Sequence, residues 1–461
     1  MALSDTAGSL MRGLGLSDPV IRLGVTGLSR AGKTVFITSL VANLLDRGRM
    51  PGLRAQADGS IKAAWLQPAP DDTVPRFDYE NYLAAMTGPE PFWPEGTRHV
   101  SELRLSLRMA PRGLLGSMTG MRNVHIDIVD YPGEWLLDLR LMDKDFAQWS
   151  AEVLDRLPGR PGADTFLAAI NALPTEAPYG EPAAQALAAT YTAHLNAARD
   201  AGFSDCTPGR FLLPGEMEGS PALTFAPLPA PHDGKRSPLY REFERRFDSY
   251  KSRVVRPFFR DHFARIDRQV VLTDVLGAIH AGPRAVEDMR RAMADILTAF
   301  RPGRSGWLSQ LLGTRRVERI LFAATKADHL NHVQHPRLTN ILTAMLREAR
   351  DRADFSGART EAMAIAALRT TTEEIIHQDG EDLPAVRGTL MDGRSAALYP
   401  GELPENPAAL LTPARDGASQ WLDGDYAIMN FAPAPDTLRP GDGPPHIRMD
   451  RVAEFLLGDR L

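Results

Sequence analysis

Residues 21–41, which read I-R-L-G-V-T-G-L-S-R-A-G-K-T-V-F-I-T-S-L-V, decide the fold of this 461-residue chain. The first part, residues 21–26, is rich in apolar and β-branched side chains, which is typical of a buried strand. Residues 27–34 fit the pattern G-x-x-x-x-G-K-[ST], and residues 35–45 then keep apolar side chains at helical spacing. This order of strand, glycine loop and helix is the context in which the pattern predicts a phosphate-binding loop.

The residue types in the loop suit the binding of a nucleoside triphosphate. Glycines let backbone N–H groups converge on phosphate oxygens, and the helix N-terminus adds its dipole. Lys33 is expected to reach the β- and γ-phosphates, and the Thr34 hydroxyl is expected to bind Mg²⁺. The other predicted nucleotide contacts of this stretch are Ser29, Arg30, Ala31, Gly32 and Val35.

The composition limits the class of protein. The chain is 43% hydrophobic and 24% charged, which is ordinary for a globular protein. Its net charge of −5 argues against a nucleic-acid coat, so no sequence-specific nucleic acid is expected as a partner. The single cysteine, Cys206, excludes an intrachain disulfide and a cysteine metal site. The sequence shows no membrane-length apolar run and no signal peptide at residues 1–18, so a cytoplasmic location is expected.

A second cluster follows the strand predicted at residues 124–129. Residues 130–133 fit D-x-x-G at the carboxyl end of that strand, the end at which α/β sheets bind ligands. Asp130 is expected to hold Mg²⁺ through a water, and the Gly133 amide is expected to contact the γ-phosphate. A glycine in this place can also act as a hinge when the phosphate leaves.

The segment between these clusters is expected to close over the nucleotide. Residues 48–96 are long and irregular, with a short helix predicted at 78–86. Long loops are often functional, and a threonine in this part of a phosphate-loop protein can close over Mg²⁺ and the γ-phosphate. Thr97 is the predicted residue because it stands just before the next strand, and Thr73 and Thr87 are the alternatives.

A third cluster predicts the base. Residues 325–328, T-K-A-D, follow an apolar strand and fit the guanine-recognition pattern [NT]-K-x-D that begins here at Thr325. The Asp328 carboxylate can accept hydrogen bonds from the N1–H and N2–H₂ groups of guanine, a donor pair that adenine lacks. The stem of Lys326 can pack over the purine face.

The whole pattern predicts an α/β fold, that of a P-loop NTPase with a mostly parallel sheet flanked by helices. The predicted strands are residues 21–26, 102–109, 124–129, 269–276, 317–324 and 362–368. In GTP-binding folds the backbone after the last strand contacts the guanine O6. Ala367, Leu368 and Arg369 are placed for that contact.

The nucleotide-binding core is predicted to be discontinuous. It comprises residues 19–134 and 269–375, and a helical insertion at 135–268 separates them. Within the insertion, residues 159–182 break the helical pattern, and Pro257 is expected to interrupt a long helix.

The C-terminal extension, residues 376–461, is predicted to hold a β-hairpin and a closing helix. The hairpin lies within residues 386–399 with a two-residue turn at Asp392-Gly393, and the helix spans 449–457.

A basic run lies on the long helix of the insertion. Its members are Arg241, Arg245, Arg246, Lys251, Arg253, Arg256 and Arg260. Because acidic residues are interleaved, a solvated helix face with salt bridges is favoured, and a face for a partner, a membrane surface or a nucleic acid is the alternative.

The motifs at residues 27–36, 130–135, 256–259 and 325–328 together resemble the YcjX family of bacterial stress-associated P-loop proteins, over nearly the whole chain. The resemblance implies GTP binding and a link to stress. The phosphate loop also resembles those of guanylate-binding proteins and atlastins. This second resemblance implies that Arg30 acts as an arginine finger in cis and that a nucleotide-dependent homodimer forms.

Three hypotheses follow from these patterns. The first is a Mg²⁺-dependent GTPase that acts as a molecular switch, with Arg30, Lys33 and Glu134 as catalytic residues. Glu134 stands where many GTPases carry a glutamine that orients water, so slow or partner-stimulated hydrolysis is expected. The second is an ATPase or phosphotransferase. The third is a nucleotide-binding interaction protein with little hydrolysis.

Overall fold

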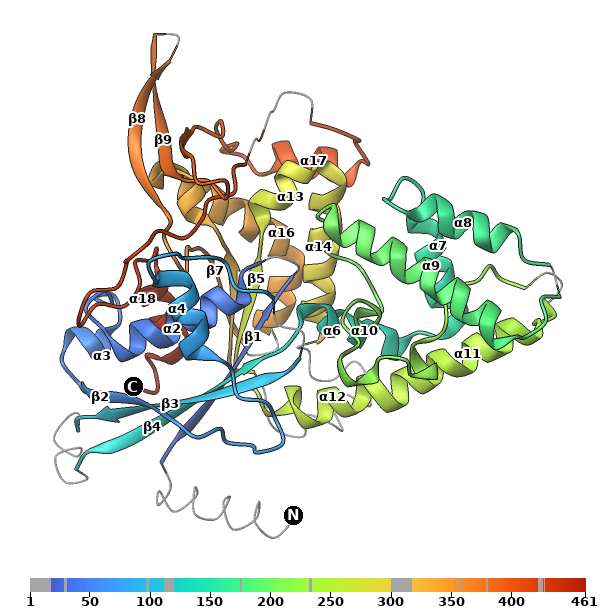
Figure 1. Cartoon of the computed structure of the whole chain (residues 1–461), viewed down its shortest axis with the longest axis horizontal. Helices are drawn as coiled ribbons and strands as arrows, with labels where there is room; N and C mark the ends of the chain where they lie inside the picture. The colour runs from blue at the N-terminus through green and yellow to red at the C-terminus, as the bar shows by residue number, and fades with distance from the viewer. Residues whose placement is uncertain are drawn as a thin grey trace.

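Seven strands form the central sheet in the order β2-β3-β4-β1-β5-β6-β7, as the computed structural model shows (Figure 1). Neighbours among β4, β1, β5, β6 and β7 pair in parallel, whereas β3 pairs antiparallel with β4 and β2 pairs antiparallel with β3. The strands are β1 Val20–Gly27, β2 Ile61–Gln67, β3 Ser101–Met109, β4 Arg122–Asp130, β5 Arg268–Thr273, β6 Arg319–Ala324 and β7 Arg359–Ala364. The predicted mostly parallel sheet is confirmed.

The structure describes residues 18–28, 31–96, 99–111, 120–174, 176–231, 234–299, 317–355, 358–378, 380–421, 426 and 428–461. Three predicted site residues, Ser29, Arg30 and Thr97, lie outside these ranges. Within them, no helix combines the length and the apolar character that crossing a membrane requires.

The segment between α2 and β3 is more regular than predicted. Residues 48–96 contain α3 Arg54–Ala57, β2 and α4 Tyr79–Thr87, of which only α4 was predicted. β2 escapes prediction because it lies at the edge of the sheet and has no clean alternation of buried and exposed residues.

Two predicted strands are too long at their carboxyl ends. β5 stops at Thr273 because Asp274 caps the next helix by accepting a hydrogen bond of 2.9 Å from Gly277 N–H. β7 stops at Ala364, and Ala366 then bridges to the C-terminal segment instead of continuing the strand. In both places the strand ends because the residues that follow it make a specific contact elsewhere. The apolar run in the sequence does not reveal that contact.

Helices cover both faces of the sheet and bury two separate apolar cores. In β6, Leu321 belongs to the core that α2 and α18 cover, whereas the next residue, Phe322, belongs to the core shared with α14, α16 and the insertion. Side chains of a strand alternate between faces, so one strand serves both cores. The covering helices are α2 Lys33–Leu45, α13 Val275–Ala281, α14 Pro283–Ala299, α16 His335–Phe355, α17 Ala408–Arg415 and α18 Met449–Leu457.

The insertion extends to one side of the sheet as a block of helices (Figure 1). Its elements are α6 Gly133–Leu137, η1 Asp138–Asp143, α7 Phe146–Arg156, α8 Ala163–Asn171, α9 Glu181–Asp200, α10 Gly209–Leu212, α11 Pro238–Tyr250, η5 Lys251–Val255 and α12 Arg256–Asp261. Aromatic rings fill its interior, where Trp149 stacks on Phe247 at 5.1 Å. The predicted break in the helical pattern at 159–182 is wrong in part, because α8 lies within that range. The long helix is interrupted by η5, a π-helical turn that comes just before Pro257.

The C-terminal hairpin is present, but it belongs to a three-stranded sheet, β10-β9-β8. The strands are β8 Thr371–Gln378, β9 Glu381–Thr389 and β10 Ser395–Leu398, and the β8–β9 pair projects from the rest of the molecule (Figure 1). The predicted two-residue turn is wrong. The connection opens at Leu390, whose N–H donates to the Arg394 carbonyl at 2.8 Å, so the turn is longer than Asp392-Gly393 alone.

Candidate functional site

The three motifs meet at the carboxyl edge of the parallel strands. Gly27 ends β1, Asp130 ends β4, and Thr325 directly follows β6. In the register of β1 and β4, Val25 stands opposite Asp130. The phosphate loop therefore leaves the sheet beside that carboxylate, although the two are far apart in sequence.

The phosphate loop passes into α2 at Gly32. This residue has φ 76° and ψ 37°, a left-handed conformation that favours glycine. Its carbonyl accepts a hydrogen bond of 2.9 Å from Phe36 N–H, and Ala31 N–H donates to the Leu28 carbonyl at 3.1 Å. The helix thus begins at Lys33, and its first N–H groups have no partner within the helix.

Lys33 and Asp130 face each other at this helix start. Lys33 Nζ lies 3.5 Å from Asp130 Oδ1, and the Asp130 side chain is 1% exposed. Neither Asp130 carboxylate oxygen has a hydrogen-bond partner among the described residues. Buried acceptors without donors are costly, and carboxylate oxygens are what Mg²⁺ and its bound waters prefer. Thr34, which follows Lys33 in α2, is buried and carries a hydroxyl. This hydroxyl and the Asp130 carboxylate are the kind of oxygen ligands that fit Mg²⁺.

Gly133 presses against the beginning of the phosphate loop. A β-carbon built on it would lie 2.0 Å from the Gly27 carbonyl oxygen, so only glycine fits at this position. Glu134 follows in α6 and is buried. The predicted hinge and the residue predicted to act on water therefore both lie at the end of β1, and their roles stay predictions.

The base motif is held by neighbouring strand ends. Lys326 has φ 59°, and its ammonium forms an ion pair with Asp274. The Asp328 side chain is buried, and its Oδ2 accepts hydrogen bonds from Thr370 N–H at 2.9 Å and from Thr370 Oγ1–H at 2.7 Å. Thr370 and Asp274 were not predicted as site residues. The signals in the sequence are weak: Thr370 stands just after the strand predicted at 362–368, and Asp274 is a carboxylate within the strand predicted at 269–276.

The loop after β7 packs against α2 and against the C-terminal segment around Pro445. Ala367 and Leu368 are buried, and the Ala367 carbonyl accepts a hydrogen bond from the Ser39 hydroxyl on α2. Arg369 N–H donates to the Pro445 carbonyl at 2.8 Å. The loop predicted to contact the guanine O6 is therefore fixed to the helix that begins at the phosphate loop.

The two alternative threonines for Mg²⁺ have local hydrogen-bond partners. The Thr73 hydroxyl bonds to Asp71 at 2.6 Å, and the Thr87 hydroxyl bonds to the Leu83 carbonyl in α4 at 2.6 Å. Neither contact brings its hydroxyl to Asp130.

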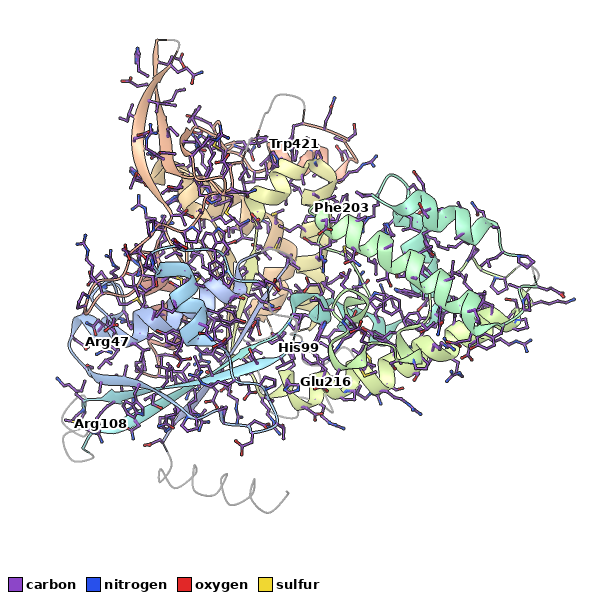
Figure 2. The ribbon with its side chains drawn as sticks, in the orientation of Figure 1. Arg47, His99, Arg108, Phe203, Glu216 and Trp421 are labelled. Atoms are coloured by element: carbon purple, nitrogen blue, oxygen red, sulfur yellow. The ribbon has the colours of Figure 1, made fainter. Side chains whose placement is uncertain are left out.

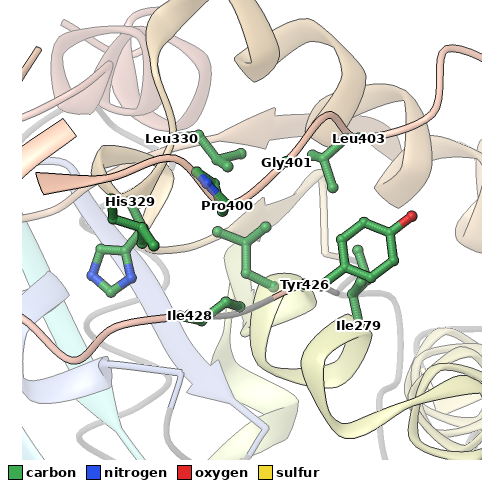
Figure 3. Close-up of a pocket in the computed structure, with 10 residues that line it drawn as sticks. Ile279, His329, Leu330, Pro400, Gly401, Leu403, Tyr426 and Ile428 are labelled. Atoms are coloured by element: carbon green, nitrogen blue, oxygen red, sulfur yellow. The ribbon is translucent and has the colours of Figure 1, made fainter. Parts of the chain in front are cut away.

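An apolar pocket lies behind the base motif. Residues of α13 and of the segment 398–403 line it, together with Tyr426 and Ile428 (Figure 3). His329, the neighbour of Asp328, also lines it. The His329 ring meets Phe431 edge to face at 5.2 Å, and burial lowers the pKa of His329. The imidazole is thus held neutral as part of the packing beneath the motif.

Comparison with known proteins agrees with this geometry. Residues 21–461 match the model of the YcjX-like family, DUF463. The chain is 37% identical over 460 residues to a protein of Escherichia coli named Ras-like GTPase YcjX, and the alignment covers 96% of each chain. It is 36% identical over 474 residues to the Ras-like GTPase YcjX of Shewanella oneidensis, with 96% of this chain and 95% of the relative covered. Together with the mixed α/β sheet and its phosphate loop, these matches show that the chain belongs to the YcjX-like family, DUF463.

Proposed function

We propose that this protein is a Mg²⁺-dependent, guanine-specific GTPase that acts as a molecular switch. The observation that carries the proposal is the buried Asp130 carboxylate, whose oxygens accept no hydrogen bond from the part of the chain that the structure describes and which lies 3.5 Å from Lys33 at the start of α2. A buried carboxylate without hydrogen-bond donors, beside a lysine and a helix N-terminus, suits a site for Mg²⁺ and phosphate.

Each residue has a role in this proposal. Lys33 and the backbone N–H groups at the start of α2 bind the phosphates, and Thr34 and Asp130 hold Mg²⁺, which neutralises phosphate charge when bound. Gly133 offers its amide to the γ-phosphate. Arg30 assists in cis, and Glu134 orients the attacking water.

Guanine selection rests on Asp328. Its carboxylate is fixed by two hydrogen bonds from Thr370 to one oxygen, so it is held in one orientation before a base arrives. Guanine then pairs its N1–H and N2–H₂ groups with this carboxylate, whereas adenine leaves the carboxylate unpaired.

Calorimetric titration of GTP, GDP and ATP with Mg²⁺ tests the proposal. We expect the wild type to prefer guanine nucleotides, and Asp328→Ala to lose that preference. Asp155→Ala is the matched control because Asp155 is exposed on α7. Equal binding of ATP and GTP by the wild type would overturn guanine selection and favour an ATPase.

A nucleotide-binding protein with little hydrolysis is the second candidate. The buried glutamate at position 134, in place of the expected glutamine, favours it. Single-turnover phosphate release separates the two candidates, because the GTPase releases phosphate above the spontaneous rate and the second candidate does not.

Three further features belong to the proposal: a nucleotide-dependent homodimer, a role in stress and a peripheral membrane contact of a cytoplasmic protein. Several arginines of the basic run are paired, such as Arg245 and Arg246 with Glu242. Sedimentation in GDP and in a GTP analogue tests the dimer, and pelleting with anionic vesicles tests the membrane contact.

A further inference from the structure

The later part of the insertion, around α10, holds the first part of the insertion, which directly follows Gly133. Gly209 N–H donates to Asp138 Oδ1 at 2.8 Å, and Trp135 Nε1–H donates to the Leu213 carbonyl at 3.2 Å. A β-carbon on Gly209 would lie 2.3 Å from the Glu134 carbonyl oxygen, so the two backbones touch. The residues just after the D-x-x-G motif are therefore anchored to the insertion as well as to the sheet.

Arg210 lies at the centre of this contact. Its guanidinium carbon is 3.2 Å from the centre of the Trp135 ring, a close cation–π contact. Its backbone N–H donates to the Tyr250 hydroxyl at 3.3 Å, and that hydroxyl donates to Asp138. Arg210 forms no ion pair with any described residue, and its only side-chain hydrogen bond there is a long one of 3.4 Å to the Pro214 carbonyl.

The other side of Arg210 meets the segment before β3. A β-carbon built on Gly215 would be 3.3 Å from Arg210 Nη1 and 3.4 Å from His99 Nδ1, so both side chains converge on this glycine. Figure 2 shows His99 beside Glu216, the neighbour of Gly215, where the sheet meets the insertion. His99 stands just before Ser101, which pairs with Asp130 across β3 and β4.

Arg210 is therefore placed between two segments that both adjoin Asp130. One is α6, which begins at Gly133, and the other is the segment that leads into β3. In GTP-binding switches, segments beside the Mg²⁺ and γ-phosphate site are the ones that order and release with nucleotide state. A single side chain that contacts Trp135 and meets the same glycine as His99 can bear on their relative position.

We infer that Arg210 is a positioning residue for GTP hydrolysis, which ties the α6 segment through Trp135 to the segment before β3 through His99. This inference rests on the proposed GTPase function. Arg210 reaches the reaction through these neighbours and is assigned no contact with the nucleotide. Its effect is to keep the groups around the γ-phosphate in a productive arrangement, because small misplacements there are costly in rate.

The experiment compares wild type, Arg210→Ala, Arg210→Lys and the control Arg241→Ala, an exposed arginine of the same insertion. Single-turnover GTP hydrolysis and GDP affinity are measured for each protein. We expect Arg210→Ala to lower the rate constant about tenfold or more, while its Kd for GDP stays within about twofold of wild type. Arg210→Lys should recover part of the rate because it keeps the charge but loses the planar stack.

The outcomes are distinguishable. An unchanged rate in Arg210→Ala, in a wild type that hydrolyses GTP, overturns the inference and leaves the proposed function intact. A wild type that neither prefers guanine nor releases phosphate overturns both. If Arg210→Ala does not fold, Tyr250→Phe replaces it, because it removes one hydroxyl from the same contact. A wild-type rate in that variant overturns the inference, and a lower rate with normal GDP affinity supports it.

Discussion

At the scale of single residues, the buried Asp130 carboxylate has the clearest consequence. Its oxygens are buried acceptors, and Lys33 is the cation beside them. We expect Asp130→Asn to lower the affinity of the GTP site for Mg²⁺ by about tenfold or more, as the loss of an outer-shell ligand does. The affinity for GTP then rises less with Mg²⁺ than it does in wild type.

Titration of GTP at several Mg²⁺ concentrations measures this effect. Asp155→Asn serves as control because Asp155 is exposed on α7. An Asp130→Asn variant whose GTP affinity still rises with Mg²⁺ as in wild type would exclude Asp130 from the metal site.

At the scale of elements, the connection from β7 to β8 joins base recognition to the projecting sheet. Thr370 holds Asp328, and β8 starts at the next residue. A hydrogen bond to a charged group contributes about 1.5–3 kcal/mol, so Thr370→Val should weaken GTP binding by about tenfold or more. ATP binding should change less, because adenine makes no use of the carboxylate.

The matched control is Thr372→Val, two residues further along β8 and exposed. Calorimetry with GTP and ATP measures both variants. Equal losses for the two nucleotides, or for the two variants, would show that Thr370 does not act through Asp328.

Sequence patterns predicted the elements that carry strong periodicity or a motif. The strands that end near Gly27, Asp130 and Thr325 are confirmed. They were predictable because each is a buried apolar run followed by a nucleotide-binding motif. β2 and α8 were missed because one is a half-exposed edge strand and the other lies in a segment rich in proline and glycine.

Contacts between distant segments could not be predicted. The bonds from Thr370 to Asp328, the pair Lys326–Asp274 and the Arg210–Trp135 contact depend on which strand ends become neighbours. The order of the strands in the sequence does not reveal which strand ends are neighbours in the sheet. For example, β5 lies between β1 and β6, although β1 is far from both in sequence.

At the scale of the whole molecule, the buried carboxyl group of Asp138 joins the start of the insertion to its later elements α10 and α11. Burial raises the pKa of Asp138 to about 7, against the opposing hydrogen bonds from Tyr250 and Gly209. In an unfolded chain the pKa of an aspartate is about 3.9. Between these values the folded protein keeps a proton that the unfolded chain has lost, so the free energy of unfolding falls as pH rises through this window.

Asp138→Asn removes the titrating group and keeps its shape. We expect the Tm of wild type, relative to that of Asp138→Asn, to fall between about pH 4 and pH 7 and to level off above that range, because within it only the unfolded chain of wild type has lost the Asp138 proton. Thermal unfolding at half-unit pH steps measures the difference, with Asp155→Asn as the exposed control. If the two Tm curves run parallel over this range, Asp138 does not titrate in the contact. The contact between the start of the insertion and its later helices then keeps the same strength across neutral pH.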